Sequence, residues 1–550
     1  MLQQSIFVKR ALALLTALPL ALLAPLHAAN GADKHGSSAA SPGLVPESKL
    51  VLAHYMTKMV PGMTGERAWA SPELYDPGGS TAALGGMYLT LPMWAVLRPE
   101  MSLDEAVDFE IRCARRMGVD GFQFYYPLFK SVAPLRDYNR IVRAFVRAAE
   151  KQHPGFKVTL CLSLGGAFPE LKEAGRAGIW GAALKELLDD TASSPAWLRT
   201  RAGSLLFYHW VTDGFADGVG HMAVTPEQVA KVAAAFGRLA AQSGHAMEWV
   251  FHVRRTKHDA AYIAAILKHF PAVWGWVEVD DDPAFWDDLA KRCAEKGVAY
   301  TQTVYPEYFT SKVYALGDEN YRLLKPAEAI QLGRQGIERH YRQTDLAKGQ
   351  ARLLQSAIDR RAQIINYATW NDWPEGQHLA PEANHNFGPS LLLRHFAAQW
   401  RGQPSPLEDQ AIVFFKKHPS TSTPAHPIAV KVKSRRNDPA AEDEVQLVTD
   451  LTVPARCEFN GKDSGTIAAG VQITSLPLPA DGPMRIRLLR KDDGKTLIDF
   501  TTQLGITRSP LRTDRLTYSY SSNFSQEFRA IFGDAQPPLP VFNKGKFPAD

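Results

Sequence analysis

The feature that most constrains the fold is an alternation of short apolar runs and amphipathic stretches between about residues 50 and 400. Eight of the apolar runs have the length and composition of buried strands, from KLVLAHYM and VDGFQFYY to QIINYATWNDW. Helical patterns such as SLDEAVDFEIRCARRMG lie between many of them. Eight strands alternating with helices predict an α/β fold, a parallel (β/α)8 TIM barrel over residues 49–402. A doubly wound open sheet is disfavoured because the sequence contains no GxGxxG after its first strand and no phosphate-binding GxxxxGK[ST] loop.

After the stretch RGQPSPLEDQ the sequence changes to short runs in which apolar and polar residues alternate. HPIAVKVKS, EVQLVTDLTV and GVQITSLPL are examples. Asn460-Gly461 and Asp493-Gly494 are dipeptides typical of tight hairpin turns. We therefore predict a small antiparallel β-sandwich over residues 403–508. The proline-rich stretch GDAQPPLPVF predicts an irregular C-terminal tail over residues 509–550.

The N-terminus has the pattern of a secretory signal peptide. Lys9 and Arg10 precede the uncharged run ALALLTALPLALLAPL, and the small residues of HAAN follow. We expect residues 1–29 to be the signal peptide and residues 30–48 to be a disordered leader. The mature protein is then expected in the periplasm or outside the cell, without a membrane span, because no later run is long and apolar enough to cross a bilayer. The net charge of +5, without a long basic block, does not suggest a nucleic-acid partner.

The cysteines and histidines show no metal-binding pattern. Cys113, Cys161, Cys293 and Cys457 are far apart and form no CxxC pair, so we expect buried free thiols. No His/Asp pair has the spacing of a zincin motif. The prediction is that the protein uses neither a metal nor an organic cofactor.

In a barrel of this type the functional residues lie where strands end, at the C-terminal face. The strand ends of this chain are rich in aromatic rings, histidine, amide and carboxylate groups. Sugar rings pack on aromatic side chains and their hydroxyls bind polar groups, so a polysaccharide or oligosaccharide is the expected partner. The residues expected to bind it are His54, Tyr55, Tyr125, Tyr126, His209, Trp210, Glu278, Tyr305, Trp370, Asn371 and Trp373.

Two carboxylates three residues apart follow the eighth predicted strand, in the stretch ATWNDWPEGQHLAP. A D-x-x-E pair in a loop is usually solvated or caps a helix. Here Asp372 and Glu375 follow a barrel strand and are interleaved with Trp370 and Trp373. Hydrolysis of a glycosidic bond needs one carboxylic acid and a second carboxylate as base or nucleophile. We predict that Asp372 and Glu375 divide these roles, in an order that the sequence leaves open.

The stretch TWNDWPEGQHLAP resembles the segment around the catalytic carboxylates of glycoside hydrolase family 71, the α-1,3-glucanases or mutanases. VLAHYM, CARRMGVDGFQF and AIVFFKKHP resemble other segments of that family. The resemblance implies a (β/α)8 barrel, cleavage of α-1,3-glucan with inversion, and essential acids at Asp372 and Glu375. It also implies a third acid at Asp120, which begins the second predicted strand and is equally consistent with a structural Asp-Gly turn.

The resemblance leaves alternatives open. Trp373-Pro374 and Gly376-Gln377 stand where the family has Tyr-Gly and Ser-His, which puts the linkage specificity in doubt. The exported endo-α-mannosidases and endo-α-mannanases of family 99 have a similar acidic motif after strand eight and are the nearest enzymatic alternative. A barrel that binds a polysaccharide without cleaving it is the alternative outside catalysis.

Overall fold

The computed structural model describes residues 49–61, 90, 92–164, 170–254, 259–318, 322–404, 409–434 and 442–537. The predicted signal peptide (1–29) and leader (30–48) lie outside the described residues. Within the ranges given, no helix combines the length and the apolar character needed to cross a bilayer.

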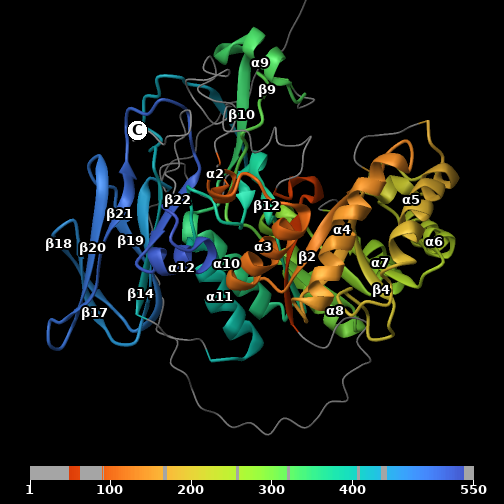
Figure 1. The fold of residues 1–550 in the computed structure, drawn as a ribbon, viewed down its shortest axis with the longest axis horizontal. Coiled ribbons are helices and arrows are strands. Elements are labelled where there is room, and N and C mark those ends of the chain that lie inside the picture. The colour runs from red at the N-terminus through yellow and green to blue at the C-terminus, as the bar shows by residue number, and fades with distance from the viewer. Residues whose placement is uncertain are drawn as a thin grey trace, which may run out of the picture. The chain divides into compact units, whose positions relative to one another are not determined.

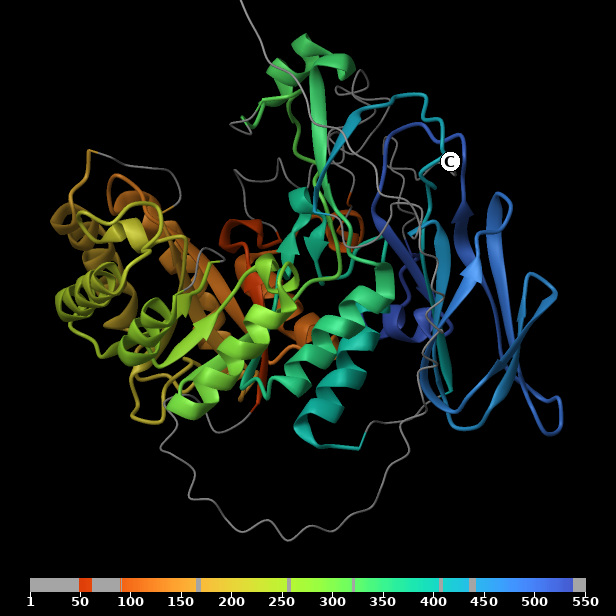
Figure 2. The same cartoon turned by 180° about the vertical axis from the view of Figure 1, so that it is seen from behind.

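Eight parallel strands form a closed barrel, which confirms the predicted fold class (Figure 1, and from behind in Figure 2). Each of the eight apolar runs forms one barrel strand. The sheet closes because β1 pairs in parallel with both β2 and β11. The barrel strands are β1 (Leu50–Tyr55), β2 (Gly121–Pro127), β3 (Lys157–Ser163), β4 (Leu205–Trp210), β5 (Met247–His252), β6 (Ala272–Trp274), β7 (Ala299–Val304) and β11 (Ile364–Tyr367).

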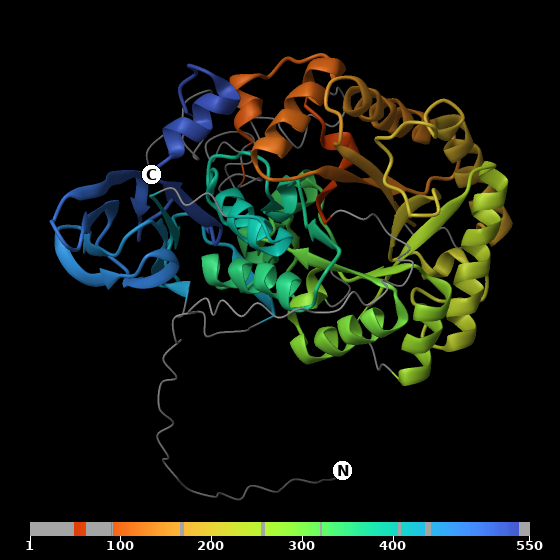
Figure 3. The same ribbon diagram turned by 90° about the horizontal axis from the view of Figure 1, so that it is seen from below.

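Helices cover the outside of the barrel, and Figure 3 shows them arranged around the strands. Their ends follow the sequence signals: Ser102 and Glu105 form a capping box at the first, and Gly244 ends another in a left-handed conformation. The covering helices are α3 (Leu103–Arg116), α4 (Ala133–Lys151), α5 (Glu173–Leu188), α6 (Pro226–Ser243), α7 (Ala260–His269), α8 (Pro283–Lys296), α10 (Leu346–Asp359) and α11 (Gly388–Arg401).

Successive residues of each barrel strand point to opposite sides of the sheet. Leu50 and Leu52 of β1 belong to a cluster that takes residues from most barrel strands and fills the interior. Val51 and Tyr55 belong instead to the large cluster between the strands and the helices. This alternation decides which residue at a strand end faces the interior.

The connection from β7 to α10 carries a small sheet that the sequence pattern did not reveal. This connection contains the strands β8 (Tyr308–Phe309), β9 (Tyr314–Ala315) and β10 (Ile337–Arg342), and the helix α9 (Pro326–Leu332). In Figures 1 and 2, β10 is the long strand beside α9. The fourth strand of the sheet, β15 (Ala429–Ser434), pairs in parallel with β10. HPIAVKVKS, which we predicted to be a sandwich strand, therefore belongs to this insertion sheet (β8, β9, β10 and β15).

Two four-stranded antiparallel sheets form the C-terminal region. Apolar residues such as Val413 and Ile486, one from each sheet, belong to one cluster, as in a β-sandwich. The first sheet has the order β19 (Gly470–Pro477), β16 (Glu444–Leu451), β14 (Gln410–Lys416), β22 (Thr517–Ser521). The second has the order β18 (Lys462–Ile467), β17 (Ala455–Phe459), β20 (Gly482–Arg490), β21 (Thr496–Ile506).

The prediction of an irregular tail over 509–550 is wrong for its first part. β22 completes the first sheet by pairing with β14, and α12 (Phe524–Phe532) follows it. Phe524, Phe528 and Phe532 recur every four residues and form one buried face of α12. The proline-rich stretch that suggested irregular structure begins only after this helix.

Candidate active site

Asp372 and Glu375 lie on a short hairpin directly after the last barrel strand. Strand β12 (Asn371–Asp372) pairs with β13 (Gln377–His378) in antiparallel fashion. One turn of 3-10 helix, η7 (Trp373–Glu375), connects them, and Gly376 ends it with φ of 63°. Because β11 ends four residues before the hairpin, both carboxylates are placed at the C-terminal face of the barrel.

The hairpin is fixed to the end of β1. The backbone N–H of Met56 donates to Asn371 Oδ1 at 2.7 Å, and the N–H of Trp370 donates to the carbonyl of His54 at 2.6 Å. Within the hairpin, the N–H of Asp372 donates to Thr369 Oγ1 at 2.8 Å. Asn371, which we expected to bind substrate, therefore has a structural partner and positions the neighbouring acid.

Asp372 is a buried carboxylic acid with a raised pKa. Its exposed fraction is 7%, and its Oδ1 has no hydrogen-bond partner among the described residues. Burial, followed by the negative charge of Glu375, raises the pKa of Asp372 to about 7. Asp372 is therefore suited to carry a proton near neutral pH.

Glu375 differs from Asp372 because it faces a cation. Lys312 Nζ lies 2.6 Å from Glu375 Oε1, and the two side chains are 22% and 23% exposed. Burial alone would lower the pKa of Lys312, but the charges of Glu375 and Asp372 outweigh it and raise this pKa above its usual value. The pair thus joins an ammonium group and a carboxylate next to a protonatable acid.

Lys312 and two tyrosines come from the segment that contains β8 and β9. We did not predict from the sequence that they belong to the site. Tyr308 and Tyr314 are close enough to Glu375 to interact with its charge. Tyr314 stacks on His340 with ring centroids 3.9 Å apart and planes 8° apart. The aromatic stretch YPEYFTSKVY after the seventh strand, with its single lysine, is the signal that could have pointed to them.

Three of the predicted substrate-binding residues, His54, Tyr125 and Trp210, lie in the barrel interior at its C-terminal end. The ring of His54 is 6.0 Å from that of Tyr125 and 5.0 Å from that of Trp276, and Trp276 lies 5.9 Å from Trp210. Tyr125 also interacts electrostatically with Asp372. Burial lowers the pKa of His54 to about 4, so this imidazole is neutral. Together His54, Tyr125, Trp210 and Trp276 form an aromatic group beside the acids.

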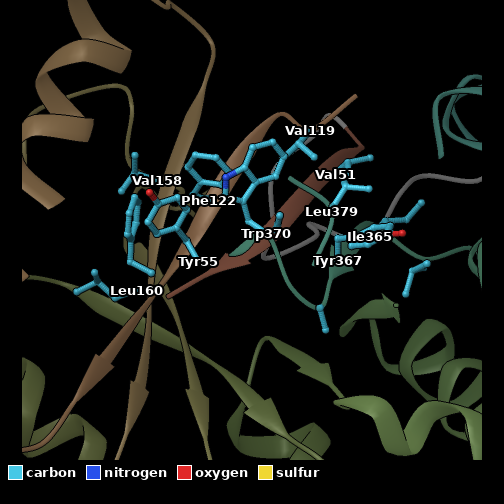
Figure 4. Close-up of a cluster of buried hydrophobic side chains, with 14 of the residues drawn as sticks. Val51, Tyr55, Val119, Phe122, Val158, Leu160, Ile365, Tyr367, Trp370 and Leu379 are labelled. Atoms are coloured by element: carbon cyan, nitrogen blue, oxygen red, sulfur yellow. The ribbon is translucent and has the colours of Figure 1, made fainter. Parts of the chain in front are cut away.

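Tyr55 and Trp370, which we expected to bind substrate, both point away from the barrel interior. Figure 4 shows them among apolar side chains that include Phe122. The ring of Tyr55 lies 4.7 Å from that of Phe122, and the ring of Trp370 lies 5.2 Å from it. The indole N–H of Trp370 donates to the carboxylate of Glu110, a buried residue of α3. Neither ring is available to a sugar.

Tyr126, His209 and Trp373, which we expected to bind substrate, are fully or almost fully buried and pack against other parts of the protein. The Tyr126 hydroxyl donates to Asn139 of α4 at 2.7 Å. His209 packs against aromatic rings of the surrounding helices and strands, among them Phe236 at 5.1 Å. The Trp373 ring packs on His378 at 4.6 Å.

Glu278 and Tyr305 lie after β6 and β7, near the same face of the barrel. Glu278 belongs to the 3-10 turn η5 (Val277–Asp280), and burial raises its pKa. The Tyr305 hydroxyl donates to Asp280 at 3.1 Å. Tyr305 is thus a buried support of η5, while Glu278 remains a partly exposed acid near this face.

Asp120 is not part of the acid pair. It precedes β2, at the opposite end of the barrel from the hairpin. Its carboxylate accepts the N–H of Val51 at 2.7 Å and forms an ion pair with Arg401 of α11. The Asp-Gly turn therefore ties the start of β2 to β1 and α11, which corrects the expectation of a third catalytic acid.

Behind the hairpin, His378, Glu382 and His385 bring potential metal-ligand atoms together. Their spacing, His-x3-Glu-x2-His, differs from the zincin patterns, and for this reason the sequence suggested no metal. None of the three belongs to the acid pair.

The comparisons with known proteins show only distant likenesses. No protein-family model matches the chain, and no curated protein matches it in sequence. The GH99 endo-alpha-mannosidase from Bacteroides thetaiotaomicron is similar with a TM-score of 0.41 and 13% identity, over 64% of this chain and 98% of that one. A glycoside hydrolase-like protein has a TM-score of 0.39 and 10% identity, over 65% and 96%. The beta-glucuronidase of Bacteroides uniformis has a TM-score of 0.38 and 11% identity, over 75% and 44%. At these values the function has to be argued from the site itself.

Proposed function

We propose that the protein is a glycoside hydrolase whose reacting groups are Asp372 and Glu375. The observation that carries the proposal is the pairing of two unlike carboxyl groups on one hairpin at the C-terminal face of the barrel. One is buried with a raised pKa, and the other is paired with Lys312. Glycoside hydrolysis needs two carboxyl groups held in different protonation states.

In this proposal Asp372 is the general acid. Its pKa of about 7 leaves a substantial protonated fraction near neutral pH, and it donates that proton to the leaving glycosidic oxygen. Glu375, neutralised by Lys312, acts as the base that takes a proton from the attacking water. Tyr125, Trp210 and Trp276 offer ring faces for the sugar, and His54 supplies a neutral imidazole next to them.

The substrate that we propose is α-glucan with α-1,3 linkages, cleaved with inversion, in an exported protein. The support is the resemblance of TWNDWPEGQHLAP to the family 71 motif and the signal-peptide pattern of residues 1–29. An endo-α-mannosidase activity is the second candidate, because family 99 enzymes have a similar acidic motif. Inversion requires carboxyl groups roughly 6.5–9.5 Å apart, with room for a water between base and sugar.

The test is product analysis over a panel of α-glucans and α-mannans with the full-length protein. We expect oligosaccharide release from α-1,3-glucan, and a decrease of about 10³-fold or more in Asp372→Asn and Glu375→Gln, since each loses a proton-transfer group. Asp120→Asn is the matched control, an acid outside the hairpin, and should keep its activity per folded molecule. Proton NMR of the first product gives the anomeric outcome.

Binding of a glucan without any bond cleavage would favour a non-catalytic barrel. Release from mannan alone would favour the second candidate. Absence of cleavage of every polymer tested, or full activity in both hairpin variants, would contradict the proposal.

A further inference from the structure

A second cluster of functional side chains lies outside the acid pair. His378, Glu382 and His385 are each 0% exposed. His385 Nδ1 lies 3.4 Å from Glu382 Oε1, and His378 Nε2 lies 4.0 Å from the same oxygen. All three potential ligand atoms lie within 4.8 Å of one another.

Three of the four histidine ring nitrogens in this cluster are buried without a hydrogen-bond partner among the described residues. Both ring nitrogens of His378 and Nδ1 of His385 lack a hydrogen-bond partner among the described residues. A buried polar atom left without a partner destabilises the fold. Two of these atoms, Nε2 of His378 and Nδ1 of His385, lie beside the carboxylate of Glu382, which indicates a group that occupies the space between them.

The surrounding hydrogen bonds leave the facing nitrogen of His385 free to coordinate. Nε2 of His385 lies 3.0 Å from the carbonyl of His378, so Nε2 carries the proton and Nδ1 carries the lone pair that faces Glu382. The Glu382 carboxylate accepts the backbone N–H groups of Asn384, at 2.7 Å, and of His385. A histidine whose second N–H is held by a carbonyl, and a carboxylate held by N–H groups, are the usual supports of metal ligands.

We propose that His378, Glu382 and His385 bind a divalent transition-metal ion, Zn²⁺ first among them, in a buried site behind the hairpin. Two imidazoles and one carboxylate form a ligand set that suits Zn²⁺. Zinc bonds of about 2.0–2.2 Å place neighbouring ligand atoms roughly 3.3–3.5 Å apart in a tetrahedral site. The pair of His385 and Glu382 already has this separation, whereas His378 Nε2, at 4.0 Å from the same oxygen, would have to move closer on binding.

Buried ionisable groups of both signs surround the cluster. Glu307 and Asp514 are buried and interact electrostatically with Glu382, which places three carboxyl groups in one interior region. Lys416 is a buried cation that interacts with Glu307 and Asp514. Oε1 of Glu307 also lacks a hydrogen-bond partner among the described residues.

The position of the cluster gives the ion a structural role. His378 belongs to β13 and is paired with Asn371 of β12, next to Asp372. The ring of Trp373 packs on that of His378. A metal held by His378 therefore fixes the hairpin that carries the acids, without itself taking part in the reaction.

The test is metal analysis of the full chain, produced without a histidine tag, in zinc-supplemented medium, and dialysed against metal-free buffer. We expect about one equivalent of zinc per chain. Removal by a strong chelator should lower Tm by several degrees, and ZnCl₂ should restore it. The variant with both His378→Gln and His385→Gln should lose at least nine-tenths of the metal. His209→Gln is the matched control, since it alters a buried histidine elsewhere and should retain the metal.

X-ray absorption at the zinc edge of the wild-type protein keeps the proposal testable if the double variant does not fold. Two imidazole ligands and no sulfur are expected, which distinguishes this site from one made by the four cysteines. A zinc content below a tenth of an equivalent with no response of Tm to ZnCl₂ would overturn the proposal. Sulfur ligation, or full metal content in the double variant, would overturn it as well.

Discussion

Pro374 lies between the two carboxylates, at the position where the family 71 motif that this stretch resembles has glycine. It occupies the first turn of η7, a position at which a backbone N–H needs no helical partner. Its carbonyl accepts the N–H of Ser311 at 2.7 Å and the hydroxyl of Thr310 at 3.1 Å. The proline thus connects the hairpin to the same segment that supplies Lys312, and the departure from the motif has a structural explanation.

The pH dependence of catalysis should follow Asp372. If Asp372 must be protonated, kcat/KM falls as the pH rises through about 7, the value to which burial and Glu375 raise its pKa. The positive charge of Lys312 opposes this shift. Lys312→Met should therefore move the alkaline limb to higher pH, whereas Lys312→Arg should leave it near its original position. Full pH profiles of the three proteins measure this, and an unmoved limb in Lys312→Met would contradict the assignment of the acid.

The same pKa shift should reduce stability at neutral pH. A carboxyl group whose folded-state pKa lies above its unfolded value of 3.8 contributes stability only at low pH, and that contribution is lost as the pH rises through about 7. Asp372→Asn should therefore be more stable than the wild type at pH 8, by roughly 2–4 kcal/mol, with a smaller difference at pH 4. Urea unfolding at both pH values measures the difference. Equal stabilities at pH 8 would show that Asp372 is not strained by its burial.

At the scale of the elements, all eight barrel strands could be predicted because each is an apolar run of strand length. The sequence did not determine to which side of the sheet each residue at a strand end points. Both residues at several strand ends were taken as substrate-binding, yet alternation sends one of each pair into the helix layer, as it does Tyr55, Tyr126 and His209.

The sequence also did not show which segments that are distant in the chain pair with one another. The strands β8 and β9 have two residues each, too few for a pattern, so the insertion sheet and Lys312 were missed. β15 has an ordinary strand sequence, and only the structure shows that it pairs with β10 instead of the sandwich. The position of Asp372 and Glu375 at the C-terminal face of the barrel could be predicted because both directly follow a run with a strong strand pattern.

Tyr125 and Tyr126 provide a matched test of the alternation. Tyr125 belongs to the aromatic group beside Asp372 and Glu375. Tyr126 donates to Asn139 in the layer between β2 and α4. Tyr125→Phe should lower kcat/KM on the polymer about 10-fold, and its loss of free energy of unfolding, through the hydrogen bond to Ser163, should be no larger than that of Tyr126→Phe. Tyr126→Phe should lower the free energy of unfolding by about 1–2 kcal/mol, through the lost buried hydrogen bond, with kcat/KM unchanged. The reverse pattern would mean that the two faces have been assigned wrongly.

On the scale of the whole molecule, the C-terminal segment holds the barrel and the sandwich together. Glu527 of α12 is buried, and its carboxylate binds Arg116 of α3 at 2.8 Å and Arg394 of α11 at 2.9 Å. The first sandwich sheet also packs on the barrel, since Ile412 and Phe414 of β14 belong to the barrel cluster. β14 is therefore buried on both faces.

Loss of the Glu527 carboxylate should weaken this attachment. In Glu527→Gln two arginines lose their shared ion-pair partner, and we expect the free energy of unfolding to fall by about 1–3 kcal/mol, since both arginines remain partly hydrated. Asp534→Asn is the matched control, because its carboxylate is fully exposed near the same helix and should change nothing measurable. Denaturant unfolding of both variants, followed by tryptophan fluorescence, measures the effect. A Glu527→Gln protein as stable as the wild type would show that α12 is held by its phenylalanines alone.

The pairing of β14 with β22 also has a consequence during synthesis. The N–H of Ala411 reaches the hydroxyl of Ser522 across 111 residues of sequence. A ribosome adding about 5–20 residues per second leaves β14 waiting roughly 6–20 s for its last neighbour. For that time the nascent chain exposes an unpaired strand edge, the kind of surface on which chaperones act and aggregation begins.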